Sequence, residues 1–440
     1  MQGQTIGPLR ISFCLSVLIG MESLPLVPEG FDHLQEIFLI GDLHADRQCA
    51  EEWVRKSGFI DLDAWKWTGG AKRALVFMGD YVDKGPYGRH VLEFVRNLTE
   101  SFPDHIVAML GNHDLYMLAD VLLEDGATQL MGSPVRNFAY AFTHPEEYLN
   151  WIPEDQRQRN DTLVVLPALY EALQYVYSRR AQSRVMMPDL FKFAPPFSTD
   201  KSFARIVKAR LREFQTFLSQ GMVNTGLAAW LGERPLVAVL GNALIVHGGL
   251  PPSLLLSLDQ RLGVATALDL ATTKAFQKLW SNHELAPGFL NGNLQEHLGK
   301  HGNFELIHEA VTYRGLHGGR HGGGGCPEVS AILEALKPEA DVDLIIVGHT
   351  PADSVRISCD GRFVAADSSL SRYFRAYGNL YCPVAVDAPR IERSGCEDGV
   401  AERCEGQASR LQHLNGKWSL KPVALGDIPD LHPRVAASEL

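Results

Sequence analysis

The chain has 440 residues, of which 45% are hydrophobic and 21% are charged, an ordinary composition for a globular protein. The net charge is −11, and no block of lysines and arginines occurs anywhere. These features argue against nucleic acid or an anionic membrane surface as the main partner. The apolar stretch Ile11–Ile19 is too short to span a bilayer, so no membrane span is expected.

The seven cysteines are scattered and include no C-x-x-C pair. An odd count without a framework favours a reducing compartment, and therefore the cytoplasm. N-terminal targeting to an organelle or to the secretory route is the alternative, because Arg10 precedes the apolar stretch Ile11–Ile19. Residues 1–35 are therefore interpreted as an N-terminal tail or targeting segment.

Three strands with helices between them are predicted in the first part of the chain. The apolar runs 36–40, 74–78 and 106–110 each end at a turn that contains glycine and aspartate or asparagine. Between them, residues 49–57 and 88–98 are predicted to be helical. This is a βαβαβ pattern, whose crossovers should be right-handed.

From about residue 115 to 235, a helical insertion interrupts this alternation. Residues 163–180 and 202–218 are predicted helices, and the apolar residues of the second lie on one face. We expect that face to pack against the main body rather than to form a groove for a partner. The insertion is interpreted as a cap or wall beside the functional site.

Two hairpins and one further strand are predicted in the second half. The strand-like runs are residues 235–239, 243–246, 343–347, 355–358 and 362–365. The turns Gly241-Asn242 and Asp360-Gly361 separate the members of the two hairpins. Beyond about residue 390 the sequence becomes polar, which predicts a loosely ordered tail.

The ends of five predicted strands carry the same kinds of polar side chain. They are Asp42 and His44, Asp80 and Asp83, Asn112 and His113, His247, and His349. Aspartate, asparagine and histidine bind metals or transfer protons. The carboxyl ends of parallel strands lie along one edge of a sheet, so these side chains can meet. The mixture of imidazole, carboxylate and amide, without cysteine, suits manganese, iron or zinc in a catalytic site.

The motif order resembles that of the calcineurin-like metallophosphoesterases and, within them, the phosphoprotein phosphatase superfamily. The motifs are Gly-Asp-x-His, Gly-Asp-x-Val-Asp-Lys-Gly, Gly-Asn-His-Asp, His-Gly-Gly and Gly-His-Thr. Tyr313-Arg314-Gly315 resembles an element of the Shewanella-like protein phosphatases.

This resemblance covers roughly residues 36–384 and implies an α/β (α+β) catalytic domain there. The implied fold is a four-layer sandwich of two central mixed β-sheets flanked by helices, interrupted by the insertion at about 115–235. Residues 385–440 would form a polar C-terminal tail.

The resemblance also implies a centre of two metal ions about 3.5–4 Å apart, with manganese favoured and iron or zinc as alternatives. The implied ligands are Asp42 and His44 for the first ion, Asp80 as the bridge, and Asn112, His247 and His349 for the second. A hydroxide between the ions would attack phosphorus in line.

The remaining site residues have implied roles at the leaving group and the phosphate. His113 would protonate the leaving oxygen, and Asp83 would orient its imidazole. Arg314, Lys84 and Asn112 would bind the phosphate. Lys84 stands where the family usually has arginine, so a compact ammonium group replaces a planar guanidinium that can form two parallel hydrogen bonds.

The leading interpretation is a metal-dependent phosphoric monoester hydrolase acting on phosphorylated protein, with a small phosphoester as the other substrate class. A bis(5′-nucleosyl)-tetraphosphatase-like hydrolase is an alternative that Asp114 favours and that Tyr313-Arg314-Gly315 disfavours. A catalytically silent phosphate-binding protein is a second alternative. It would require the loss of a metal ligand, and none of the six is missing from the sequence.

Overall fold

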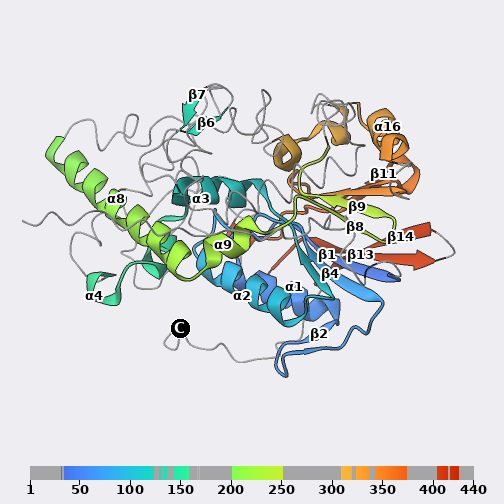
Figure 1. Cartoon of the computed structure of the whole chain (residues 1–440), viewed down its shortest axis with the longest axis horizontal. Helices are drawn as coiled ribbons and strands as arrows, with labels where there is room; N and C mark the ends of the chain where they lie inside the picture. The colour runs from blue at the N-terminus through green and yellow to red at the C-terminus, as the bar shows by residue number, and fades with distance from the viewer. Residues whose placement is uncertain are drawn as a thin grey trace, which may run out of the picture.

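The structure is a computed structural model, and two five-stranded mixed sheets lie at its centre (Figure 1). It describes residues 31, 34–122, 128–130, 133–135, 143–157, 166, 168, 201–250, 309–319, 324–336, 342–373, 404–414 and 417–425. Within these residues, no helix is both long and apolar enough to cross a membrane.

The first sheet contains three parallel strands and an antiparallel hairpin. Its order is β14 (Lys417–Ala424), β13 (Gln407–Leu414), β1 (Glu36–Ile40), β4 (Arg73–Phe77) and β5 (Ile106–Ala108). Strands β1, β4 and β5 run parallel, and β13 pairs antiparallel with β1. The three predicted strands of the βαβαβ pattern are thus confirmed.

The second sheet has a parallel centre with an antiparallel strand at each edge. Its order is β11 (Arg356–Ser358), β12 (Phe363–Ala365), β10 (Leu344–Val347), β9 (Ala243–Val246) and β8 (Val237–Leu240). Strand β10 lies parallel to β9 and to β12, and the pairs β8–β9 and β11–β12 are antiparallel. Both predicted hairpins and the predicted strand at 343–347 are therefore confirmed.

Helices and short elements surround the two sheets. The helices are α1 (Arg47–Ser57), α2 (Gly88–Ser101), α3 (Asn112–Leu122), α4 (Glu154–Arg157), α8 (Lys201–Asn224), α9 (Leu227–Gly232) and α16 (Cys326–Leu336). The short elements are β2 (Ile60–Asp61), β3 (Lys66–Trp67), β6 (Thr128–Leu130), β7 (Ser133–Val135), η2 (Pro145–Asn150), η4 (Gly315–His317) and η6 (Cys359–Gly361).

The core shows that the molecule is built in four layers, because alternate residues of a strand face opposite sides. Phe38 of β1 shares one buried cluster with Trp53 of α1, whereas Ile37 shares another with Ile245 of β9. On the far side of the second sheet, Ile332 of α16 joins the helix-facing cluster. Helices therefore cover the outer faces of two sheets that pack face to face, as expected.

The described part of the insertion packs against the main body. In α8, Val207, Leu211, Phe214 and Leu218 are buried in the same cluster as residues of α2 and α3. This confirms the expectation for that helix, except that Ile206 is 52% exposed although its spacing placed it on the buried face. The predicted helix at 163–180 lies outside the described residues, apart from 166 and 168.

The C-terminal segment corrects one expectation. Residues 407–414 and 417–424 form the antiparallel strands β13 and β14 of the first sheet, where a loosely ordered tail was predicted. In β13, Ala408 and Leu411 are the buried apolar residues, one on each face of the sheet, and β14 is largely exposed. Because so few apolar side chains are needed at this edge, their pattern is too weak to predict strands.

Two disulfides, Cys49–Cys404 and Cys326–Cys359, contradict the expectation that the cysteines stay reduced. The first connects α1 to the segment that leads into β13, and the second connects α16 to the β11–β12 hairpin. The paired cysteines are 355 and 33 residues apart in sequence, so their spacing gave no sign of a framework.

Candidate metal centre

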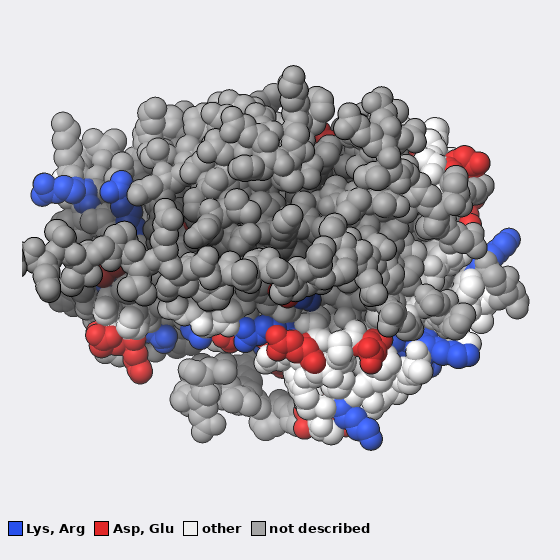
Figure 2. All heavy atoms as spheres, in the orientation of Figure 1, with Lys and Arg blue, Asp and Glu red and all other residues white. Residues whose placement is uncertain are grey.

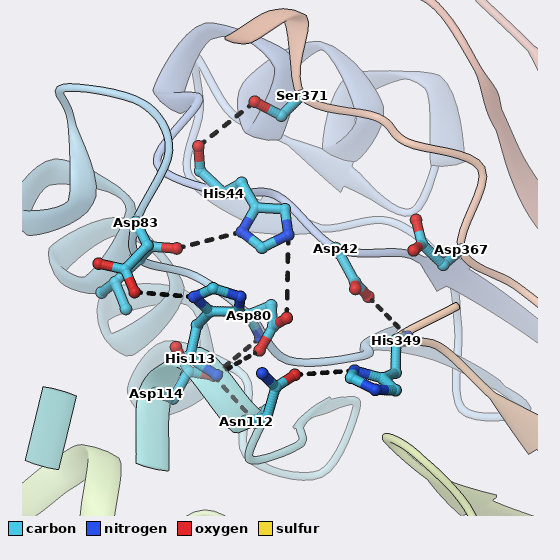
Figure 3. Close-up of polar contacts among 12 residues, drawn as sticks. Asp42, His44, Asp80, Asp83, Asn112, His113, Asp114, His349, Asp367 and Ser371 are labelled. Atoms are coloured by element: carbon cyan, nitrogen blue, oxygen red, sulfur yellow. Dashed lines mark hydrogen bonds and ion pairs between the residues drawn. The ribbon is translucent and has the colours of Figure 1, made fainter. Parts of the chain in front are cut away.

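The predicted site residues meet at the carboxyl ends of strands from both sheets (Figure 3). Strand β1 leads to Asp42 and His44, β4 to Asp80 and Asp83, β5 to Asn112 and His113, β9 to His247, and β10 to His349. Each of these side chains belongs to a buried residue. The fold therefore gathers polar groups from five separate turns into one buried place.

Several of these residues have a backbone conformation that side chains other than glycine rarely adopt. The φ angles are 41° at His44, 55° at Asp80, 68° at Asp83, 71° at Lys84 and 62° at His349. Such conformations cost about 1–3 kcal/mol each and cluster at functional sites. Hydrogen bonds between turns hold them, such as that from the His44 backbone N–H to the Asp80 carbonyl at 2.8 Å.

Glycine at position 111 allows the turns after β4 and β5 to approach each other. A Cβ atom on Gly111 would lie 2.2 Å from the backbone nitrogen of Asp80 and 2.2 Å from its Oδ1. No side chain fits there. The motif Gly-Asn-His-Asp thus needs its glycine for close contact with Asp80.

Two groups of side chains among the described residues could each hold a cation. The first is His44, Asp80 and His113, and the second is Asp80, His247 and His349. Within each group the ligand atoms lie within 4.8 Å of one another. Asp80 belongs to both groups, so one carboxylate faces two possible cation positions.

Asn112 joins the second group, and Asp42 lies beside it. The Asn112 Oδ1 atom is 2.8 Å from Nδ1 of His349 and 3.1 Å from Nε2 of His247. Asp42 belongs to neither group, and its Oδ1 accepts a hydrogen bond from the His349 backbone N–H at 3.4 Å. The structure thus brings all six predicted ligands together, with Asp42 at the margin.

Backbone carbonyls orient two of the histidines. The Nδ1 atom of His247 is 2.6 Å from the Met78 carbonyl oxygen, and Nδ1 of His44 is 3.3 Å from that of Val82. A carbonyl can only accept, so Nδ1 of each neutral ring carries the proton. Nε2 of each ring is then the unprotonated nitrogen, as in metal-ligating histidines, which donate their other ring N–H to a carbonyl or carboxylate.

Charge interactions reinforce the suitability of the site for cations. Burial alone would raise the pKa of Asp80, but His247 and His113 hold that pKa well below its ordinary value. Burial and the nearby Asp367 carboxylate raise the pKa of Asp42 well above its ordinary value. Two buried carboxylates that repel each other are stabilised when a cation binds between or beside them.

His113 is paired with Asp83 at the edge of the first group. The Nδ1 atom of His113 lies 2.8 Å from Oδ2 of Asp83, and the imidazole of His44 packs edge-on against His113. The His113 backbone N–H also donates to Oδ1 of Asp80 at 2.9 Å. An imidazole whose Nδ1 is held by a carboxylate can exchange a proton at Nε2.

Asp114 has a structural task that the sequence did not reveal. Its carboxylate accepts backbone N–H groups from Gly111 at 2.9 Å, Asp80 at 2.8 Å and Tyr81 at 2.9 Å. The side chain therefore ties together the turns after β4 and β5. Aspartate at this position is explained by the architecture of the site and does not by itself indicate a substrate.

The two predicted phosphate-binding cations lie at the site. The Arg314 guanidinium donates from Nε to Nε2 of His349 at 3.1 Å. Lys84 is 8% exposed and lies near Asp83. Burial raises the pKa of Asp83 well above its ordinary value, and the positive charge of Lys84 offsets part of that rise. Both positive charges therefore flank the metal-binding groups.

Asp367 is a site residue that the sequence reasoning missed. It follows β12, is 1% exposed, and lies next to Asp42 and His349 in Figure 3. Burial raises its pKa to about 6. The rule that revealed the other residues, a polar side chain just after a buried strand, would also have selected Asp367.

The two mixed sheets and the shared carboxylate of Asp80 define a candidate site for two cations. Residues 36–185 match the family model described as calcineurin-like phosphoesterase, as the motif order predicted. The matched part includes the first three motifs, with Asp42, Asp80 and Asn112.

Individual relatives match over shorter lengths. A Shewanella-like protein phosphatase 2 of Arabidopsis thaliana is 33% identical over 88 residues, which are 19% of this chain and 22% of the relative. A symmetrical bis(5′-nucleosyl)-tetraphosphatase of Nitrosospira multiformis is 29% identical over 116 residues, 26% of this chain and 36% of the relative. The chain therefore spans well under half of the length of either relative.

Among solved structures, a cold-active protein-tyrosine phosphatase of a psychrophilic Shewanella species is similar to this chain. The TM-score is 0.46 and the sequence identity is 17%, over 89% of this chain and 80% of that one.

Proposed function

We propose that this protein is a metal-dependent phosphoric monoester hydrolase with a dinuclear centre. The observation that carries the proposal is the position of Asp80, whose carboxylate belongs to both groups of metal-binding side chains. A shared carboxylate between two cation positions is the arrangement of enzymes that hydrolyse phosphate esters with two metals.

The residues present fit two such ions. Asp42 and His44 would hold the first, Asp80 would bridge, and the second would be held by Asn112, His247 and His349. When bound, two cations would activate the attacking water and neutralise charge on the phosphoryl oxygens. The nitrogen and oxygen donors are compatible with manganese, which we favour, and with iron or zinc.

The remaining residues act on the leaving group and the phosphate. His113 donates a proton to the leaving oxygen, and Asp83 holds the imidazole by Nδ1 and stabilises its charged form. Arg314 offers a guanidinium fork to two phosphate oxygens, and Lys84 offers a single centre of charge. The amide nitrogen of Asn112 is the third phosphate contact.

Phosphorylated protein is the substrate class that we favour, because Tyr313-Arg314-Gly315 resembles the Shewanella-like protein phosphatases and one of these is a relative. A small phosphoester is the other substrate of the same chemistry. Hydrolysis of dinucleoside tetraphosphates is a second function, supported by the tetraphosphatase relative. Turnover of phosphopeptides and of diadenosine tetraphosphate, measured on one preparation, distinguishes the two.

The activity is tested by removing and restoring the metal. The purified chain is stripped with a chelator, reloaded with manganese, iron or zinc, and assayed with an aryl phosphate. We expect turnover to require two ions per chain, and Asp80→Asn to lose both metal and turnover. A chain that binds two ions and hydrolyses no phosphate ester would instead be a binding protein.

The two disulfides also bear on where the protein functions. Disulfides persist in oxidising compartments and are rare in the cytosol. We therefore favour an organelle or the secretory route over the cytoplasm. Peptide mapping without reductant, on protein isolated from its native source, should recover Cys49 joined to Cys404 and Cys326 joined to Cys359. Free thiols at all four positions would restore the cytoplasmic assignment.

A further inference from the structure

The segment 143–151, within the insertion, is attached to the turn that carries Asp83. The Thr143 hydroxyl donates to Oδ1 of Asp83 at 3.3 Å. Four residues further on, the Glu147 carboxylate accepts the backbone N–H groups of Gly88 at 2.7 Å and Arg89 at 2.9 Å. This part of the insertion is therefore built into the wall of the site.

The two oxygens of the Asp83 carboxylate have different partners. Oδ2 faces Nδ1 of His113 at 2.8 Å, and Oδ1 accepts from Thr143. Thr143 is 1% exposed and Asp83 is 3% exposed, so water cannot easily replace the hydroxyl. The terminal torsion of aspartate has a broad energy minimum, and a carboxylate held through one oxygen can turn about it. The Thr143 hydroxyl supplies the second point of attachment.

We propose that Thr143 is a positioning residue for the proton donor. Its hydroxyl fixes the plane of the Asp83 carboxylate, so that Oδ2 stays on Nδ1 of His113 and Nε2 points to the leaving oxygen. The proposal rests on the proposed phosphatase function, and it assigns to the insertion a part in proton transfer. Thr143 itself contacts neither substrate nor metal.

The consequence is specific to the leaving group. An alkoxide leaves poorly and needs the proton, whereas a nitrophenolate leaves readily without it. A hydrogen bond to a charged group changes a rate by about tenfold or more when it is lost. Loss of the Thr143 hydroxyl should therefore slow alkyl phosphates about tenfold and leave nitrophenyl phosphate almost unchanged.

The experiment compares Thr143→Val with Thr143→Ser on esters whose leaving groups range from nitrophenol to simple alcohols. Thr143→Val keeps the shape and removes the donor, so kcat should fall more steeply as the leaving group becomes poorer. Thr143→Ser keeps the hydroxyl and should restore the wild-type dependence. Thr143→Ala serves as a second variant without the donor if Val does not fold.

Glu147→Gln is the matched control, because it weakens the same segment without touching Asp83. We expect it to lower Tm and to affect all esters equally, with metal content unchanged in every variant. The role of Thr143 is refuted if the Thr143→Val enzyme keeps the wild-type leaving-group dependence or loses activity equally on all esters. Either result leaves the proposed function intact. A wild-type chain that hydrolyses no ester refutes the proposed function, and this inference with it.

Discussion

His113 is a member of the first group of possible metal ligands, so its role as acid must be separated from a role as ligand. Its Nδ1 atom is taken up by Asp83, which favours proton donation from Nε2. We expect His113→Asn to retain both ions while losing activity, most strongly for esters with poor leaving groups. Metal analysis of the purified variant decides, because a ligand role predicts the loss of one ion.

Asp367 should strengthen metal binding through its charge beside Asp42. Residues that support metal ligands typically change affinity about 10- to 100-fold when mutated. We therefore expect Asp367→Asn to weaken metal binding by that factor in a competition with a chelator. Asp353→Asn, which neutralises an exposed carboxylate, is the control and should bind as the wild type does. Equal metal affinities in the wild type, Asp367→Asn and Asp353→Asn would show that Asp367 does not support metal binding.

Arg314 and Lys84 should contribute unequally to phosphate binding. The guanidinium of Arg314 already lies against His349, and lysine cannot reproduce its fork. Arg314→Lys should lower kcat/KM about ten- to hundredfold, whereas Lys84→Arg introduces the residue that the family usually has and should be tolerated. Steady-state kinetics and inhibition by inorganic phosphate test both variants. Unchanged values for Arg314→Lys and Arg314→Ala would show that Arg314 does not contact phosphate.

At the scale of single residues, the sequence identified site residues that follow an apolar run and missed a residue that does not. His247 and His349 end buried strands, so their positions could be inferred. Thr143 lies in an insertion with no strand before it, and only tertiary structure brings it to Asp83. Asp367 follows the predicted strand at 362–365, but it lies in none of the motifs that marked the other site residues.

At the scale of elements, strands with a continuous apolar run or a hairpin turn signal were predictable, and β13 and β14 were not. Strand β10 is buried throughout and was recognised as a continuous apolar run. Strands β13 and β14 mix polar and apolar residues because much of their surface meets water. Long-range pairing, here with β1, decides their structure, and local sequence carries little information about it.

The two disulfides should stabilise these elements to different extents. Removal of a native disulfide typically costs about 2–5 kcal/mol, and more for longer loops in the chain-entropy model. Cys49–Cys404 closes a loop of 355 residues and is buried, whereas Cys326–Cys359 closes one of 33. Cys404→Ser should therefore lower the free energy of unfolding more than Cys326→Ser. Denaturant titrations of the two variants, with the wild type as reference, measure the difference.

At the scale of the molecule, the four-layer architecture followed from the family resemblance, and the alternating pattern of strands and helices supported it. Figure 2 shows lysine and arginine side chains interspersed with aspartate and glutamate on the described part of one face. Neither composition nor charge could predict which phosphoester enters the site.

The pairing of β1 with β13 has a consequence for how the protein is made. On one side β1 pairs with β4, which is synthesised soon afterwards. On the other side it pairs with β13, and an ion pair joins Glu36 of β1 to Arg410 of β13, 374 residues later in the sequence. While the chain emerges from the ribosome, the strand that presents Asp42 and His44 has an open edge, and open edges pair readily with other chains. This edge therefore stays open until β13 has been synthesised, and a chaperone that shields β1 in the meantime would raise the yield of folded protein.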